Sequence, residues 1–205
     1  MGDVLSALRA KLQQWLTGQR AEMHHVRGFR VVVENSRPDI ATDAVLSRLD
    51  EALALLEQYE PRRTRHLARD LEQILVSRYP CRGAYFGDSR TCLTELTFLA
   101  RRDISPAVVA SSILHEGTHA RVAEFRRRVG GQMREEDRAR EERLCRRAEI
   151  AFGKALPTEL GAPVIERAQA SIDMDDHGVA PVIDWTIAQQ RIEQADTQGR
   201  PTPRP

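Results

Sequence analysis

Two histidines four residues apart constrain the fold of this chain more than any other feature. The sequence is His-Glu-Gly-Thr-His at 115–119, within residues 105–125, whose pattern predicts a helix. Positions four apart on a helix lie on one face, so the imidazoles of His115 and His119 can reach the same metal ion. Glu116 would then stand beside the ion, where a carboxylate can take a proton from water. The motif therefore predicts a zinc site with a general base.

The residues around the motif also favour a helix. Ser105 is a good N-cap, and Pro106 suits the first helical position. Gly117 is unfavourable inside a helix, by about 1 kcal/mol relative to alanine. We therefore expect another backbone or a substrate to approach the helix closely at Gly117.

Zinc needs a third protein ligand and an open position for water. A metzincin would have glycine and histidine where this chain has Val122 and Phe125, so that class is excluded. A glutamate on a second helix is the alternative source. The charged segment after Gly130 and Gly131 supplies three candidates: Glu141, Glu142 and Glu149.

Glu142 is the favoured third ligand. With Cys145 and Ala148 it forms a stripe on which two small residues let the helix pack tightly against the motif helix. Glu149 lies on the same face and is the alternative. Whichever of the two glutamates does not bind metal would hold a ligand histidine by accepting its second N–H. A polar turn before Gly178 better explains the remaining candidates, which are Asp173, Asp175, Asp176 and His177.

The spacing of apolar residues predicts the other elements of the chain. Short β-branched or alternating segments predict strands at 29–33, 84–86 and 91–99. Helical periodicity predicts helices at 4–18, 41–59, 62–79, 135–152 and 158–172. Residues 1–196 are expected to form a single domain, followed by a disordered proline-rich tail at 197–205.

The composition fits a soluble globular protein. Of the 205 residues, 41% are hydrophobic and 30% charged, and the net charge of +1 gives no electrostatic reason to expect nucleic acid, an acidic substrate or a membrane surface as a partner. No apolar run approaches the roughly 20 residues of a membrane span. The N-terminal sequence lacks the features of a secretory signal, so a cytoplasmic location is expected. The three cysteines are an odd number without a Cys-x-x-Cys pair, and they predict small buried side chains rather than disulfides or a thiolate zinc site.

The motif and the glutamate helix resemble those of the zincin metallopeptidases. The resemblance covers about residues 84–156 and is to compact gluzincin-like proteins of the bacterial minigluzincin kind, although the Asn-Glu-x-x-Ser-Asp sequence of thermolysin-like proteins is missing. It implies an α+β fold with a small, mostly antiparallel sheet packed on a motif helix and a glutamate helix, with additional N-terminal helices. In zincins the strand before the motif helix is typically the sheet edge that binds the substrate backbone. That role would fall to the strand from Thr91 to Leu99, although an internal strand would show the same sequence pattern.

These residues predict a zinc-dependent peptidase. His115, His119 and Glu142 would hold Zn²⁺, and Glu116 would accept the proton of a water molecule and pass it to the leaving nitrogen. Three kinds of oxyanion donor are open: Tyr85, His177 or one of several arginines. Two alternatives remain, a catalytically silent zincin-like binding or regulatory domain, and a helical structural protein with incidental histidines.

Overall fold

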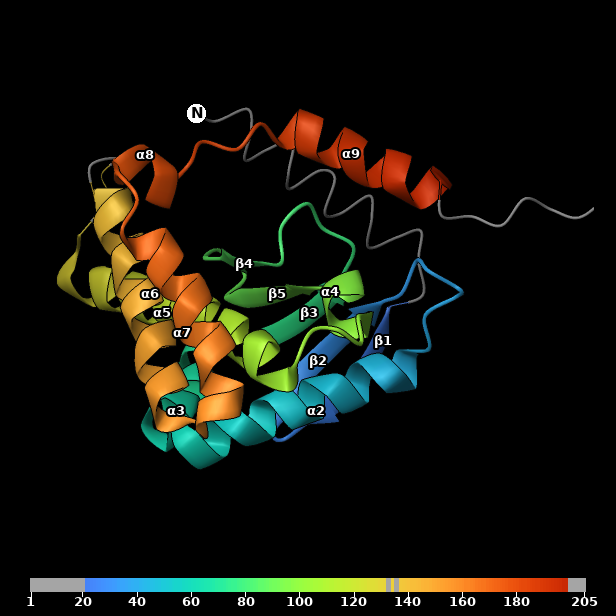
Figure 1. Ribbon diagram of the computed structural model, residues 1–205, viewed down its shortest axis with the longest axis horizontal. Helices are drawn as coiled ribbons and strands as arrows, with labels where there is room; N and C mark the ends of the chain where they lie inside the picture. Colours follow the sequence, from blue (N-terminus) through green and yellow to red (C-terminus); the bar gives the residue numbers. More distant parts are fainter. Residues whose placement is uncertain (1–20, 132–133, 135–136, 199–205) are drawn as a thin grey trace, which may run out of the picture.

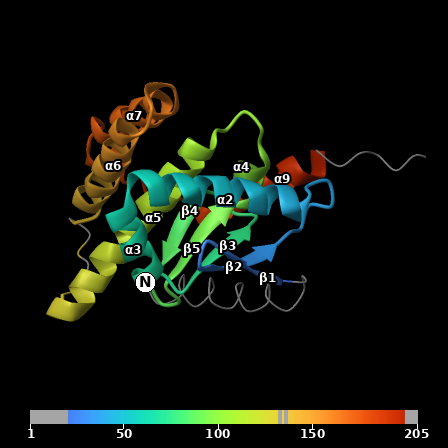
Figure 2. The same ribbon diagram turned by 90° about the horizontal axis from the view of Figure 1, so that it is seen from below.

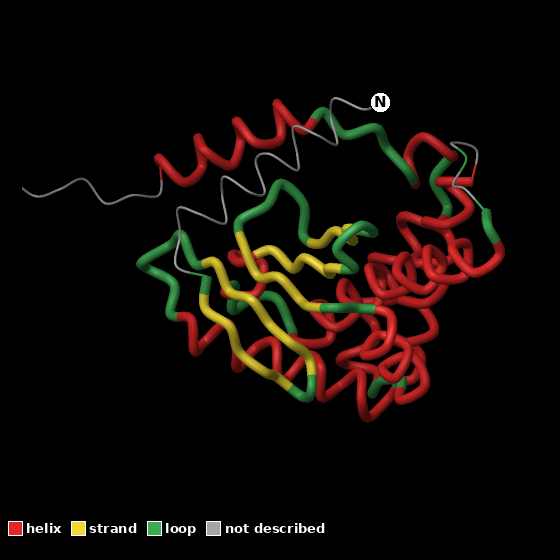
Figure 3. The backbone as a smooth tube through the Cα atoms, turned by 180° about the vertical axis from the view of Figure 1, so that it is seen from behind, coloured by secondary structure: helices red, strands yellow, loops and turns green. Residues whose placement is uncertain are grey.

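Five strands form one open sheet at the centre of the protein. The computed structural model describes residues 21–131, 134 and 137–198. The strand order is β1-β2-β3-β5-β4, so β1 and β4 lie at the two edges (Figure 3). The strands are β1 (Glu22–Val26), β2 (Phe29–Glu34), β3 (Gln73–Ser77), β4 (Gly83–Phe86) and β5 (Thr91–Glu95). The fold is therefore mixed α and β.

The sheet is not mostly antiparallel. β2, β3 and β5 run parallel to one another, and only the two edge strands are antiparallel to their neighbours. The parallel pairs arise because a helical segment connects β2 to β3, whereas a short turn connects β4 to β5. The expected sheet type was wrong in this respect.

Helices cover the sheet unevenly. α2 (Thr42–Tyr59) lies on one side of the sheet, and α9 (Trp185–Gln198) lies on the other (Figure 1). α6 (Arg138–Ala155) and α7 (Thr158–Ile172) run side by side and pack against α5 (Pro106–Val129) at one end of the molecule (Figure 2). The shorter helices are α3 (Pro61–Asp70), α4 (Leu96–Ala100) and α8 (Asp176–Val179). Among the described residues, none of these helices is long and apolar enough to cross a membrane.

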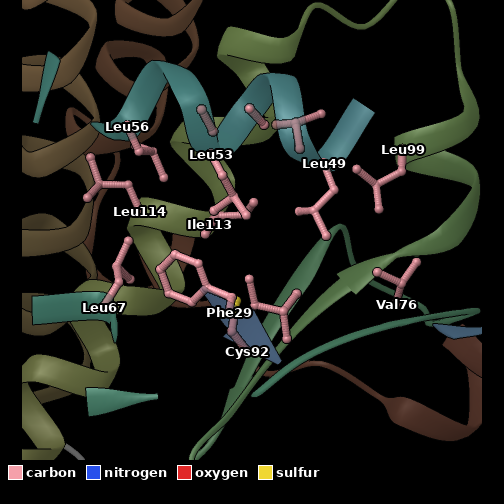
Figure 4. Packing of buried hydrophobic residues seen from close by; sticks show 14 of the residues in the cluster. Phe29, Leu49, Leu53, Leu56, Leu67, Val76, Cys92, Leu99, Ile113 and Leu114 are labelled. Atoms are coloured by element: carbon pink, nitrogen blue, oxygen red, sulfur yellow. The ribbon is translucent and has the colours of Figure 1, made fainter. Parts of the chain in front are cut away.

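The hydrophobic core lies between α2, α5 and one face of the sheet. Leu49 and Leu53 of α2 point toward Ile113 of α5 and toward Phe29 and Cys92 of the sheet (Figure 4). All five side chains are buried. The core fixes α5 against the sheet and so positions the motif that this helix carries. Cys92 is one of three free cysteines, as expected for a small core residue.

Several expected elements agree with the structure. β2, α2 and β4 cover the segments predicted at 29–33, 41–59 and 84–86, with one residue of difference at an end. α7 has the predicted bounds, and α6 begins three residues later than predicted and ends three residues later. The helix predicted at 4–18 lies outside the described residues. Of the tail predicted at 197–205, the first two residues belong to α9 and the others are outside the description.

Two expected elements were wrong. The helix predicted at 62–79 is α3 followed by β3, whose residues Ile74, Leu75 and Val76 are buried between two neighbouring strands. A short aliphatic run fits a strand covered on both faces as well as it fits a helix, so pairing with β2 and β5 decides its structure. The strand predicted at 91–99 ends at Glu95, whose side chain accepts a hydrogen bond of 2.7 Å from Phe98 N and caps α4.

Candidate metal centre

The motif lies in the middle of α5. The Ser105 hydroxyl accepts a hydrogen bond from Val108 N, Pro106 takes the first helical position, and Gly130 ends the helix in a left-handed conformation with φ of 68°. The predicted caps are thus confirmed. His115 and Glu116 are buried, at 7% and 8% exposure, on the part of α5 that faces α6 and β4. The helix therefore presents the motif to the protein interior.

The two imidazoles meet the carboxylate of Glu142. Nε2 of His115 lies 3.2 Å from Nε2 of His119. The Glu142 oxygens lie 3.2 Å from Nε2 of His115 and 3.3 Å from Nε2 of His119. Two atoms bound to one tetrahedral zinc at about 2.0–2.1 Å are about 3.3 Å apart. Oε2 of Glu142 faces His115 and Oε1 faces His119, so the structure brings the three predicted ligand residues together, with each of these three contacts close to that distance.

The outward nitrogens of both histidines are held by glutamates of α6. Nδ1 of His115 lies 2.8 Å from Glu149 Oε1, and Nδ1 of His119 lies 2.7 Å from Glu141 Oε1. In a neutral histidine that faces a carboxylate through Nδ1, the proton is on Nδ1 and the lone pair is on Nε2. Three acceptors, the two Nε2 atoms and the Glu142 carboxylate, then converge, and a cation satisfies all of them.

Arginines balance the charges of these glutamates. Arg126 pairs with Glu141, and Arg146 and Arg167 each lie 2.7 Å from a Glu149 oxygen. Burial opposes ionisation of Glu149, but the hydrogen bond from His115 and the nearby positive charges outweigh it and lower its pKa to about 2. Glu149 therefore remains a carboxylate that can orient His115.

The acidic side chains around the two histidines attract positive charge. Burial disfavours the charged form of His119, but contacts with Cys145, Glu141 and Glu142 outweigh it and raise the His119 pKa well above 6.5. Acidic surroundings of this kind bind a cation in place of the protons that they would otherwise take up.

Glu116 lies next to the converging atoms but outside their set. Burial raises its pKa above the ordinary 4.5, and the positive charges of His115 and His119 partly offset this effect. A Cβ at Gly83 of β4 would lie 3.0 Å from Glu116 Oε1, so the absence of a side chain at Gly83 lets the edge strand pass directly over the carboxylate. A carboxylate with a raised pKa is a stronger base than an exposed one.

Sequence reasoning missed Cys145 as a residue of this site and missed the contact that Glu141 makes. Cys145 has its sulfur within 4.8 Å of ligand atoms of both histidines, and burial raises the pKa of its thiol to about 11. Its position three residues after Glu142, on the same helix face, was the available signal. The sequence named Glu141 as a candidate metal ligand, and in the structure it contacts Nδ1 of His119 instead. Cys145 and Glu142 are thus both close enough to the histidines to be the third ligand, and the Glu142 oxygens lie 3.2 Å and 3.3 Å from the two Nε2 atoms.

Gly117 is needed for packing on the opposite side of α5. A Cβ at this position would lie 1.8 Å from Cδ2 of Leu67 in α3. A side chain therefore makes the close approach, and the expectation of a backbone or a substrate was wrong. The glycine lets α3 seat against α5 beneath the motif.

A cavity of about 1050 Å³ adjoins the centre. The cavity is lined by His115, Glu116 and His119 of the motif and by Tyr85 of β4. Ile183, just before α9, and Trp185, the first residue of α9, also line it. β5 lies between β3 and β4, so the expected substrate edge from Thr91 was wrong, and the edge strand beside the cavity is β4. Of the two named oxyanion candidates, Tyr85 lines the cavity and His177 does not.

The acidic cluster near Gly178 lies away from the cavity lining. Asp175 caps α8 by accepting a hydrogen bond of 2.7 Å from Gly178 N. Asp176 pairs with Arg143, and Asp173 accepts hydrogen bonds from Gln169. These contacts account for the cluster locally, as the polar-turn interpretation predicted.

Comparisons with protein-family models, with curated proteins and with solved structures gave no match. A functional assignment therefore depends on the geometry of this centre.

Proposed function

We propose that this protein is a zinc-dependent peptidase. His115, His119 and Glu142 would hold the metal, and Glu116 would be the general base. The observation that carries the proposal is the convergence of three side chains: the two Nε2 atoms lie 3.2 Å apart, and each has one Glu142 oxygen at 3.2–3.3 Å, with Glu116 buried beside them. The two carboxylates on the Nδ1 atoms add support, because partners of this kind fix the orientation of ligand histidines.

Bound zinc would supply a Lewis acid that polarises a carbonyl and lowers the pKa of water from 15.7 toward about 7. Glu116 takes the proton of the attacking water and then donates it to the leaving nitrogen, a transfer that its raised pKa favours. Tyr85 can donate its hydroxyl to a developing oxyanion, since burial raises its pKa and keeps it protonated.

The edge of β4 is the proposed binding surface for the peptide. β4 pairs with β5 on one side, and in the described residues it has no strand on the other. Gly83, Ala84 and Tyr85 of this strand line the cavity. An extended peptide can therefore add to this edge by backbone hydrogen bonds, which would bring a scissile bond to the metal centre.

Replacing Glu116 by glutamine tests the proposal. General base catalysis contributes typically 10²–10⁴-fold, so we expect Glu116→Gln to lose at least about 100-fold in the cleavage of a peptide library while it retains one zinc ion. Glu124→Gln is the matched control, since Glu124 lies on the same helix but pairs with Arg127 and Arg128 instead. Equal, negligible cleavage by zinc-loaded wild type and Glu116→Gln would favour the silent binding domain. Failure to bind zinc would overturn both metal hypotheses.

A further inference from the structure

We infer that Arg82, Arg146 and Arg167 form an anion subsite beside the metal centre and that this subsite takes a carboxylate of a peptide. The inference deepens the proposed function, because it names the class of substrate. The three arginines come from different parts of the chain: Arg82 directly precedes β4, Arg146 belongs to α6, and Arg167 belongs to α7. All three line the same cavity as Glu116 and His115.

The positive charge of this group exceeds what the neighbouring protein offsets. Arg146 and Arg167 share the carboxylate of Glu149. Arg167 also donates a hydrogen bond of 2.9 Å to the Ser111 hydroxyl. In the described part of the chain Arg82 has no ion pair, and its guanidinium carbon lies 5.8 Å from the centre of the Phe98 ring. Among the described residues, the three guanidiniums thus have one carboxylate, that of Glu149, as an ion-pair partner.

The guanidiniums also have donors that the protein does not use. The Nε atoms of Arg146 and Arg167 are buried without a hydrogen-bond partner. In the described residues, Nη2 of Arg146 and Nη1 of Arg167 likewise have no hydrogen bond, and Arg82 has none from its side chain. Each guanidinium has five N–H donors, and leaving such donors unpaired is unfavourable. Oxygens of a ligand in the cavity would satisfy part of this set.

The crowding of like charges is visible in the acid–base behaviour of Arg82. Partial burial lowers its pKa from the ordinary 12.5, and repulsion from Arg167, Arg101 and Arg146 lowers it further. An arginine still remains charged at neutral pH. A bound anion would relieve this repulsion, whereas a neutral ligand would not.

A carboxylate suits the site better than a phosphate. Arginine binds both groups through paired N–H donors. Glu149 already offsets one of the three charges, and Glu116 and Glu142 line the same cavity, so a singly charged group matches the remaining charge more closely. In a peptide bound along β4, the carboxylate can be a Glu or Asp side chain or the C-terminus.

Three labelled peptides of one sequence separate these sources. One has a central glutamate and an amidated C-terminus, the second has glutamine and the amide, and the third has glutamine and a free C-terminal carboxylate. Binding is measured by fluorescence anisotropy on the full chain, first after metal removal and then with zinc. We expect one of the two charged peptides to bind about tenfold more tightly than the neutral peptide, the effect of one charge-assisted hydrogen bond. The preferred peptide identifies the source of the carboxylate.

Arg82→Gln should abolish this preference and Arg82→Lys should retain part of it. Arg82 is the right position because, unlike Arg146 and Arg167, it does not hold Glu149. The matched control is Arg128→Gln, which removes the same charge from an exposed side chain that pairs with Glu124. Equal binding of all three peptides, or a preference that survives in Arg82→Gln, would overturn the subsite. If a charged peptide binds preferentially but no peptide is cleaved, the subsite is supported and the peptidase proposal is refuted. If peptides are cleaved but none binds preferentially, the peptidase proposal is supported and the subsite is refuted.

Discussion

Two clusters of buried charge in this protein are built in different ways. In the first, at one end of β3 and β5, Arg78 lies between the carboxylates of Glu95 and Asp196. Arg78 uses its Nε and both Nη atoms, and the second oxygen of Glu95 accepts from the Thr97 hydroxyl and from Phe98 N. Each carboxylate oxygen of this cluster has a partner among the described residues.

The second cluster, at the contact of α5 and α6, has its outer groups paired and its inner groups converging. Glu141 and Glu149 have arginines and the Nδ1 atoms of the histidines as partners. In the described residues Glu142 has only the two Nε2 atoms. We call the group of Arg78, Glu95 and Asp196 the closed cluster, because each of its carboxylate oxygens has a partner among the described residues. A closed cluster stabilises one arrangement of the chain, whereas converging acceptors provide a place for a cation. The difference separates a structural ion pair from a candidate binding centre.

The largest expected effect is on zinc affinity at the converging cluster. Glu142→Gln should weaken zinc binding by more than the 10–100-fold that is usual for a residue that only orients a ligand. Glu149→Gln and Glu141→Gln should stay within that range, and Cys145→Ser should have little effect. Competition with a chelating dye measures all four variants. A greater loss in Glu149→Gln or in Cys145→Ser would transfer the ligand role to that residue.

The second effect, on stability, belongs to the closed cluster. Arg78→Met leaves Glu95 without a cation, whereas Asp196 keeps its pair with Arg37 at 3.0 Å. The Arg78 side chain is 12% exposed and that of Glu95 is 7% exposed. Breaking a buried pair typically costs about 3–5 kcal/mol, and we expect the lower end of this range in the free energy of unfolding, with zinc affinity unchanged. The control is Arg101→Met, whose pair with Asp103 is exposed and should contribute less than about 1 kcal/mol. Similar unfolding free energies for the two variants would contradict the closed-cluster interpretation.

The same difference explains what the sequence could predict. The histidine spacing, the N-cap at Ser105 and the glutamate helix depend on local periodicity. These features predicted three candidate ligands, His115, His119 and Glu142, whose side chains the structure brings together. The place of Cys145 beside the histidines and the contact of Glu141 with His119 were missed because they depend on how α6 crosses α5, which local spacing does not determine. β3 was mistaken for helix because its pairing partners lie far away in the chain.

The arginines were missed for the same reason. In sequence, Arg82, Arg146 and Arg167 look like ordinary members of a chain that is rich in charged residues. Only the approach of α6, α7 and the loop before β4 places them around one cavity. A site assembled from three separate segments has no spacing that could reveal it.

The smallest expected effect is the pH dependence of the closed cluster. The hydrogen bond from Arg78 lowers the pKa of Asp196 below its ordinary 3.8, against the opposing effect of burial. The stabilisation of α9 by Asp196 is therefore complete above about pH 4 and is lost as the pH falls through the lowered pKa of the folded state. Asp196 is 22% exposed, so we expect no more than about 1 kcal/mol.

Trp185 reports on this loss because its ring centre lies 5.6 Å from that of Tyr79, at the start of the helix that Asp196 anchors. The chain has two tryptophans, so a Trp15→Phe background leaves Trp185 as the only one. Its fluorescence should change as the pH falls below about 4 in this background, and the part of the change due to Asp196 should be absent in Asp196→Asn. If both proteins gave the same profile, Asp196 would not be the anchor of α9. Trp185, the first residue of α9, also lines the cavity beside the candidate metal centre. A change in zinc affinity in Asp196→Asn would therefore show that the two clusters are coupled.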